Sequence, residues 1–393
     1  MNTHSAPLTL DLVTGGPTFR LMLRVGLANP AAPRLLRAAL VFLLATWAPL
    51  ALLTLVAGTA FVGSSAQPFA RDFAVHARLL LAVPLFLLSE VTIGPRLRAV
   101  AATFIRAGIV RESEIAAYDD AVRAAIRLRD SGIAEIALVA LAVGGTIATT
   151  VVKLSNPTES WALLIADGGA HLTAAGWWYA LVGVPVFQFF LLRSLWRGII
   201  WTRFLGAMAG LDLSLVATHP DHAGGLGFVG VGQTSWVMLV LAISIVLAGS
   251  FADAVVYGDR HVLDFKLPIA AYGAIAALAL LGPLLKFRAP LARTRFAALL
   301  EYGALVHDHH LAFDRKWIGG SVAPDEMLLG NPDASSLADT SAGYELVAAM
   351  RTLPASLRDI VPLVVAVVLP MIPLLAIEIP IAEILKRLLA IIA

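Results

Sequence analysis

The residues best suited to chemistry lie in one short polar string, 218–228. His219, Asp221 and His222 place two imidazoles and a carboxylate within four residues, a set that can bind divalent metals or move protons. Three glycines follow in the same string: Gly224, Gly225 and Gly227. Because glycine has no side chain, the backbone there can approach a ligand closely.

This string has three interpretations. It can be a tight, glycine-rich helix entry in which His219 and Asp221 make caps and turn hydrogen bonds. It can be the mouth of an anion or substrate site that uses backbone N–H groups and a helix N-terminus. It can also hold a metal or handle protons. A dinucleotide site is not predicted, because no strand precedes the glycines.

A second polar cluster follows the sixth apolar segment. His307, His310 and Asp314 are spaced i, i+3, i+7, so one face of a helix carries all three. Together with His219 and Asp221, they are the candidate ligands of a divalent metal ion, the only cofactor that the sequence suggests. The alternative is a hydrated polar face on which the histidines titrate freely.

Two polar residues lie inside long apolar stretches, Glu90 and Gln188. A charge in hydrocarbon is costly, so such a group usually faces a cavity or pairs with another residue. Glu90 and Gln188 are therefore candidate residues of a pathway through the membrane. Pairing between helices is the alternative.

The elements that position these residues are membrane helices. The chain has 393 residues, of which 59% are hydrophobic and 14% charged, too apolar to cover itself in water. The net charge of +2 indicates no nucleic-acid partner, and the lack of cysteine excludes thiolate chemistry. The sequence predicts an all-α polytopic bundle in a lipid bilayer with about seven transmembrane helices: 38–62, 77–94, 132–152, 176–192, 234–255, 267–285 and 360–377.

Arginine and lysine set the orientation of these helices. These residues gather before the first apolar segment and in every second loop between the apolar segments. Because cytoplasmic loops are rich in Lys and Arg, this pattern places the N-terminus in the cytoplasm. We expect a cytoplasmic N-terminal segment (1–37), a transmembrane bundle (38–285) with cytoplasmic loops at 95–131 and 193–233, a cytoplasmic helical hairpin (286–359), and a last transmembrane helix with an interfacial C-terminal helix (360–393). The preference for arginine over lysine and the abundant alanine are typical of a bacterium, so the inner membrane is the expected location.

The cytoplasmic hairpin is predicted to form a small helical cap. One helix is expected over 293–317, and a second over 335–353, with Ser335 or Ser336 as its N-cap and Pro354 after its end. Too small to bury a core alone, this cap should dock on the spans or on a second copy in a homo-oligomer. No internal repeat is evident in the sequence.

The string from His219 to Phe228 resembles the H-P-D-x-A-G-G-L-G-F signature of a group of uncharacterised bacterial multi-pass inner-membrane proteins. The stretch 328–339, with Met350, Arg351 and Pro354 downstream, looks like a second block of the same group. The resemblance covers roughly the C-terminal half and implies a membrane protein without a settled activity. In that group the position of His222 often carries a different basic residue, which argues against His222 as an essential ligand.

Three functions fit these observations. The first is a transporter or channel for a small solute or ion, supported by kinked spans and few buried charges. The second is a membrane-embedded metal-dependent enzyme that uses the His/Asp residues to activate water. The third is a membrane scaffold or sensor that acts through its cytoplasmic cap.

Overall fold

Seven helical runs give the protein its shape. The computed structural model describes residues 7–27, 34–61, 66–166, 169–320, 326–328 and 330–378. Within these ranges, the helical runs long and apolar enough to cross a membrane are Arg37–Val56, Phe73–Arg106, Gly132–Ser155, Ala174–Ala209, Gly227–Tyr257, Val262–Ile318 and Leu357–Glu378. The predicted all-α class and the predicted number of spans are therefore confirmed.

The first four spans form one half of the bundle. Their helices are α2 (Arg34–Val56), α3 (Phe73–His76), α4 (Val83–Arg106), α6 (Gly132–Ser155), α7 (Ala174–Trp178) and α8 (Val184–Ala209). Spans 2 and 4 are much longer than predicted, since span 2 continues for about three turns and span 4 for almost five turns beyond the apolar stretch. Much of the predicted loops 95–131 and 193–233 is consequently helix, including α5 (Ile115–Arg129).

The other three spans complete the bundle. Their helices are α9 (Gly227–Thr234), α10 (Val237–Tyr257), α11 (Lys266–Leu281), α14 (Leu357–Val368) and α15 (Ile372–Glu378). The expected interfacial helix beyond Glu378 lies outside the described residues. A two-stranded antiparallel hairpin, β1 (Leu163–Ala166) and β2 (Gly169–Leu172), is an addition to the predicted all-helical pattern.

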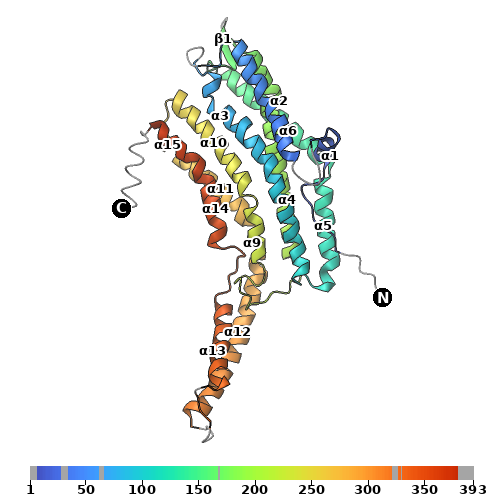
Figure 1. The fold of residues 1–393 in the computed structure, drawn as a ribbon, viewed down its shortest axis with the longest axis vertical. Helices are drawn as coiled ribbons and strands as arrows, with labels where there is room; N and C mark the ends of the chain where they lie inside the picture. Colours follow the sequence, from blue (N-terminus) through green and yellow to red (C-terminus); the bar gives the residue numbers. More distant parts are fainter. Residues whose placement is uncertain are drawn as a thin grey trace.

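The helical cap is present, with different ends. The sixth span continues into α12 (Arg288–Phe313), which packs against α13 (Pro332–Ala348). The N-cap of α13 is Asn331, whose side chain accepts a hydrogen bond from Asp333 N at 2.9 Å, so the prediction of Ser335 or Ser336 was wrong. Asn331 is the better cap because Pro332 fits the first helical position. The pair extends away from the bundle at the end opposite the β hairpin (Figure 1).

Spans 2 and 4 repeat one pattern. Each begins at a capping side chain, Asp72 or Thr173, which accepts a hydrogen bond from the backbone N–H three residues later. A short α-helix follows, then a π-helical turn at Ala77–Ala82 or Tyr179–Gly183, and then a long helix that opens with Val-Pro. The repeat is therefore structural, which corrects the expectation drawn from the sequence, where little more than Val-Pro-x-Phe is shared.

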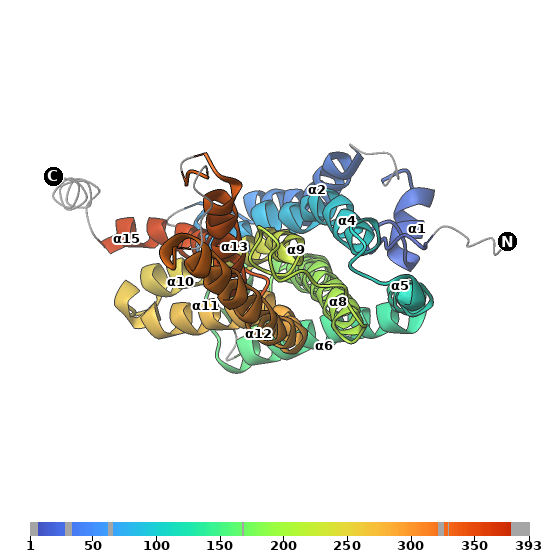
Figure 2. The same ribbon diagram turned by 90° about the horizontal axis from the view of Figure 1, so that it is seen from below.

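The two copies meet through equivalent residues. Arg78 Nη1 donates to Tyr179 Oη at 2.8 Å, and these residues are 101 apart in the sequence. The rings of Phe86 and Phe187 lie 6.0 Å apart at the same sequence separation. Equivalent residues that contact each other lie on the interface between the two copies. Figure 2 shows the result: α4 and α8 lie between α2 and α6, and α2 packs on α4 as α6 packs on α8.

Candidate functional site

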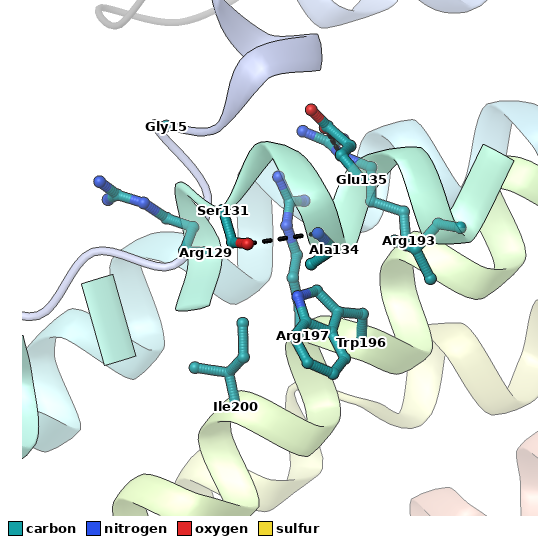
Figure 3. A pocket seen from close by; sticks show the side chains of 10 residues that line it. Gly15, Arg129, Ser131, Ala134, Glu135, Arg193, Trp196, Arg197 and Ile200 are labelled. Carbon is teal, nitrogen blue, oxygen red and sulfur yellow. Dashed lines mark hydrogen bonds and ion pairs between the residues drawn. The ribbon is translucent and has the colours of Figure 1, made fainter. Parts of the chain in front are cut away.

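A small polar cavity lies where α6 and α8 meet the N-terminal segment (Figure 3). Its volume is ≈ 20 Å³, enough for about one water molecule. Its polar lining includes three arginines, one carboxylate and one indole: Arg129, Arg193, Arg197, Glu135 and Trp196. The Trp196 indole N–H is buried and has no hydrogen-bond partner among the described residues. The arginines are paired with carboxylates, Arg129 with Asp130 and the other two with Glu90, whereas the Trp196 N–H still lacks an acceptor.

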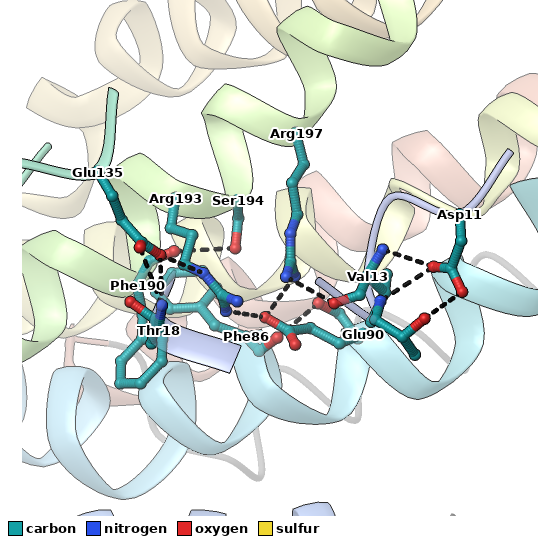
Figure 4. Close-up of polar contacts among 12 residues, drawn as sticks. Asp11, Val13, Thr18, Phe86, Glu90, Glu135, Phe190, Arg193, Ser194 and Arg197 are labelled. Atoms are coloured by element: carbon teal, nitrogen blue, oxygen red, sulfur yellow. Dashed lines mark hydrogen bonds and ion pairs between the residues drawn. The ribbon is translucent and has the colours of Figure 1, made fainter. Parts of the chain in front are cut away.

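Glu90 lies beside this cavity at the centre of a buried charge cluster (Figure 4). Its Oε1 is 2.6 Å from Arg193 Nη1 and 2.5 Å from Arg197 Nη1. All three residues are about 5% exposed. Arg193 and Arg197 are four residues apart on α8, so the helix presents both guanidinium groups to the same face of α4. The structure thus pairs Glu90 instead of leaving it open to a wide channel.

The N-terminal strap, residues 7–16, covers this cluster. Leu10, Leu12 and Val13 are buried, and the Val13 carbonyl accepts a hydrogen bond from Arg197 Nη2 at 3.2 Å. Asp11 forms an ion pair with Arg98 of α4. The strap thus joins the polar cluster to the apolar core.

The short helix that follows the strap is fixed by two carboxylates. Gly16 is the N-cap of helix α1 (Pro17–Arg24), and its N–H donates to Asp130 Oδ1 at 2.8 Å. The Thr18 N–H donates to Glu135 Oε2 at 2.9 Å. Carboxylates are favourable at a helix N-terminus because the free N–H groups there carry partial positive charge. Asp130 and Glu135 therefore fix the start of α1.

Gln188 lies on α8, one turn before Arg193 toward the β-hairpin end. Thr146 Oγ1 of α6 donates to Gln188 Oε1 at 3.5 Å, the limit of a hydrogen bond. Gly145 leaves room for the amide, since a Cβ there would lie 2.8 Å from Gln188 Oε1. Gln188 thus contacts α6 between the spans, separate from the Glu90 cluster.

The glycine-rich string folds around its own carboxylate. Asp221 accepts hydrogen bonds from the N–H groups of Ala223, Gly225 and Gly227, at 2.7, 3.2 and 2.7 Å. Positive φ angles at His222, Gly224 and Gly225 turn the backbone toward it. The N–H groups predicted for an anion or substrate are therefore already used, and the first interpretation, a tight helix entry, describes this loop.

Charge on Asp221 suits these surroundings. Partial burial raises its pKa, but the three backbone hydrogen bonds and His219 lower it by more, so the pKa of Asp221 lies below its ordinary value of 3.8. His219 Nδ1 lies 2.9 Å from Asp221 Oδ1. Arg351 also closes the loop, since its Nη2 donates to the Asp221 carbonyl at 2.7 Å and its N–H to the His222 carbonyl at 2.7 Å.

The candidate metal ligands do not form one site. In the described part of the chain, no group of three or more His, Asp or Glu side chains is arranged to hold a metal ion. His310 Nε2 is 3.1 Å from Ser341 Oγ of α13, so it helps to join the two helices of the cap. The pair His219–Asp221 stays within its own loop.

Several site residues were missed from the sequence. The sequence predicts a cytoplasmic loop at Arg197, although its spacing of four from Arg193 is typical of one helix face. Asp11 and Val13 gave no signal, because their partners are more than 80 residues away. Comparisons of the chain with protein-family models, curated proteins and solved structures gave no match.

Proposed function

We propose that the protein is a membrane transporter for a small anionic solute, and that the strap closes its cytoplasmic side. The observation that carries the proposal is the arginine-lined cavity beside Glu90, in whose wall the buried Trp196 N–H has no partner among the described residues. Buried donors without acceptors favour water or an anion. Withdrawing the strap would separate Asp11 from Arg98 and the Val13 carbonyl from Arg197, which would leave guanidinium N–H groups free to bind an anion.

The repeated spans support transport. Many transporters consist of two related halves with the substrate near the interface between them, and their helices are often interrupted there. Spans 2 and 4 are equivalent, each contains a π-helical turn, and the Glu90 cluster lies on the interface between them. π-Helical turns in α-helices are frequent at functional sites.

The proposed setting is the inner membrane of a bacterium, with the N-terminus, the strap and the α12–α13 cap in the cytoplasm. The uneven distribution of arginine supports this orientation. The natural absence of cysteine allows a direct test with single introduced cysteines. In spheroplasts, a membrane-impermeant maleimide should label His171→Cys in β2 and leave Ser113→Cys unlabelled until the membrane is opened. The reverse pattern would overturn the orientation.

We also propose membership of the family with the H-P-D-x-A-G-G-L-G-F signature. Its support is that the two sequence blocks behind the resemblance touch each other. Arg351 from the second block holds the loop of Asp221 and His222 in the first. Because the second block closes the loop of the first, we expect relatives that contain one block to contain the other as well.

Anion flux tests the transport proposal. The protein is reconstituted in liposomes, and valinomycin-driven potassium efflux reports the movement of chloride, nitrate, phosphate or acetate. We expect flux of at least one anion, a decrease of tenfold or more in Arg197→Gln, and an increase in Asp11→Asn, which loosens the strap. Asp212→Asn is the control, since Asp212 forms only an exposed pair with Arg111. Wild-type and Asp11→Asn liposomes that leak no more than empty ones would refute the proposal for these anions.

A scaffold function is the second candidate, and one observation favours it. The α12–α13 cap projects from the bundle and exposes Phe296 and Leu300, which are 67% and 62% exposed. Such an apolar surface suits a second copy of the chain in a homo-oligomer. Size-exclusion chromatography in mild detergent measures the oligomeric state. If both the wild type and Phe296→Ser were monomers, this function would have no support.

A further inference from the structure

A second, larger cavity lies on the other side of α8. It is a groove of ≈ 580 Å³ between α8, α10 and α11, within the usual volume of a ligand site. Its walls are mainly aliphatic, with Leu195 and Ile199 on α8, Ile243 on α10, and Ile275 and Leu278 on α11. Four of these side chains are at least 42% exposed, and all five lie in segments that span the membrane. The groove therefore opens toward the bilayer.

One end of the groove is polar and carries an unpaired positive charge. Lys286, in the helical turn Gly282–Phe287 between α11 and α12, is exposed, and its Nζ donates to the Thr202 carbonyl at 3.2 Å. Among the described residues no carboxylate lies within ion-pair distance of Lys286. Its side chain contacts α8 at Gly206, where a Cβ would lie 2.5 Å from Nζ. The ammonium group is thus held against α8 at the mouth of an apolar groove.

The side chain of Trp236 lines the same groove. Trp236 is 5% exposed, and its indole N–H has no hydrogen-bond partner among the described residues. Its ring lies against Gly198, 3.8 Å from where a Cβ would be. Gly198 and Gly206 are two turns, or about 12 Å, apart on α8. The groove therefore offers a cation at its end and an aliphatic channel with an aromatic ring in its wall.

We propose that this groove binds one phospholipid with an anionic headgroup from the leaflet at the arginine-rich end of the bundle. The lipid phosphate pairs with Lys286, and an acyl chain lies along Ile199, Ile243 and Ile275. Charge complementarity selects the lipid, because basic pockets between membrane helices attract anionic headgroups. Two further polar side chains of the groove are already bonded: Gln233 to Trp201 and to the Leu280 carbonyl, and Tyr272 to the Val240 carbonyl.

Native mass spectrometry of the full chain in mixed micelles tests this site. The micelles contain equal amounts of phosphatidylglycerol and phosphatidylcholine. We expect one tightly held lipid per chain, with phosphatidylglycerol preferred. Lys286→Gln should reduce this preference about fivefold, whereas Lys286→Arg should keep it. The matched control is Lys266→Gln, which removes an exposed lysine from the other end of α11 and should change nothing.

A second variant tests the groove itself. Ala279→Trp fills the channel from its exposed rim and should abolish the tightly held lipid, while size exclusion and thermal unfolding show that the chain remains folded. The proposal would be overturned if the wild type retained both lipids equally. It would also be overturned if Lys286→Gln left the preference for phosphatidylglycerol unchanged, or if Ala279→Trp left the amount of tightly held lipid unchanged. A third result would also overturn it: a wild-type oligomer that holds no lipid and dissociates in Ala279→Trp, because a second copy would then occupy the groove.

Discussion

Two carboxylates organise this protein in different ways. Asp221 is satisfied by backbone N–H groups within six residues of itself, in a loop that Arg351 closes. Glu90 is satisfied by two guanidinium groups from a helix that begins almost a hundred residues later. The comparison shows that the more conspicuous motif in the sequence is a self-contained turn, whereas the less conspicuous residue holds helices together.

The largest expected effect comes from breaking the long-range cluster. Glu90→Ala leaves two buried arginines without a counter-charge, which should lower the free energy of unfolding by about 3–5 kcal/mol. Denaturant titration in detergent micelles measures the loss. Glu112→Gln, an exposed acid, should change little. Replacing Glu90, Arg193 and Arg197 together by leucine should recover most of the stability, and a triple variant as unstable as Glu90→Ala would contradict this account.

A smaller effect is expected from breaking the local loop. Asp221→Ala leaves three backbone N–H groups without their acceptor and should cost about 1–3 kcal/mol, measured in the same titration. Asp221→Asn keeps one acceptor oxygen and should lose less. If Asp221→Ala were as damaging as Glu90→Ala, the loop would have a role beyond its own geometry.

The pH dependence should separate the loop from the strap. The pKa values of Asp221 and Asp11 are both below their ordinary value of 3.8, so the stability that each carboxylate contributes is complete above about pH 4 and is lost as the pH falls through the folded-state pKa. For Asp11, burial raises the pKa, while hydrogen bonds from Thr14 and Val13 and the charge of Arg98 lower it by more.

Thermal unfolding midpoints between pH 2 and pH 6 measure this dependence. The midpoint should fall in acid, and either Asp221→Asn or Asp11→Asn should flatten part of that decrease. Only Asp11→Asn should also change the cleavage rate of the strap by an added protease. An unchanged acid profile in both variants would refute the assigned charges.

The smallest effect is expected in the cap. His310→Ala removes one hydrogen bond to Ser341 and should cost about 1 kcal/mol or less. Because no three ligands converge in the described residues, adding zinc or a chelator should leave the thermal unfolding midpoint unchanged in both the wild type and His310→Ala. A midpoint that zinc raises in the wild type and leaves unchanged in His310→Ala would restore the metal interpretation.

The membrane helices could be predicted because hydrocarbon imposes length and composition on each span separately. Glu90 could also be singled out, since a charge within apolar sequence needs a partner. The identity of its partners could not be predicted, because the packing of α4 against α8 decides that Arg193 and Arg197 lie beside Glu90. The repeat was hidden for a similar reason: Asp72 and Thr173 differ as residues yet make the same cap, so the geometry is shared while most letters are not.

The continuity of α11 into α12 has a mechanical consequence. From Lys266 to Phe313 the helical path is broken only by the tighter turn Gly282–Phe287, at the foot of the cap. Helix α12 has 26 residues, so it is a rod about 39 Å long. A tilt of about 10° at its foot would move its tip by about 7 Å, given that length. A small rearrangement among the spans would therefore reach the far end of the cap as a displacement large enough for another protein to sense.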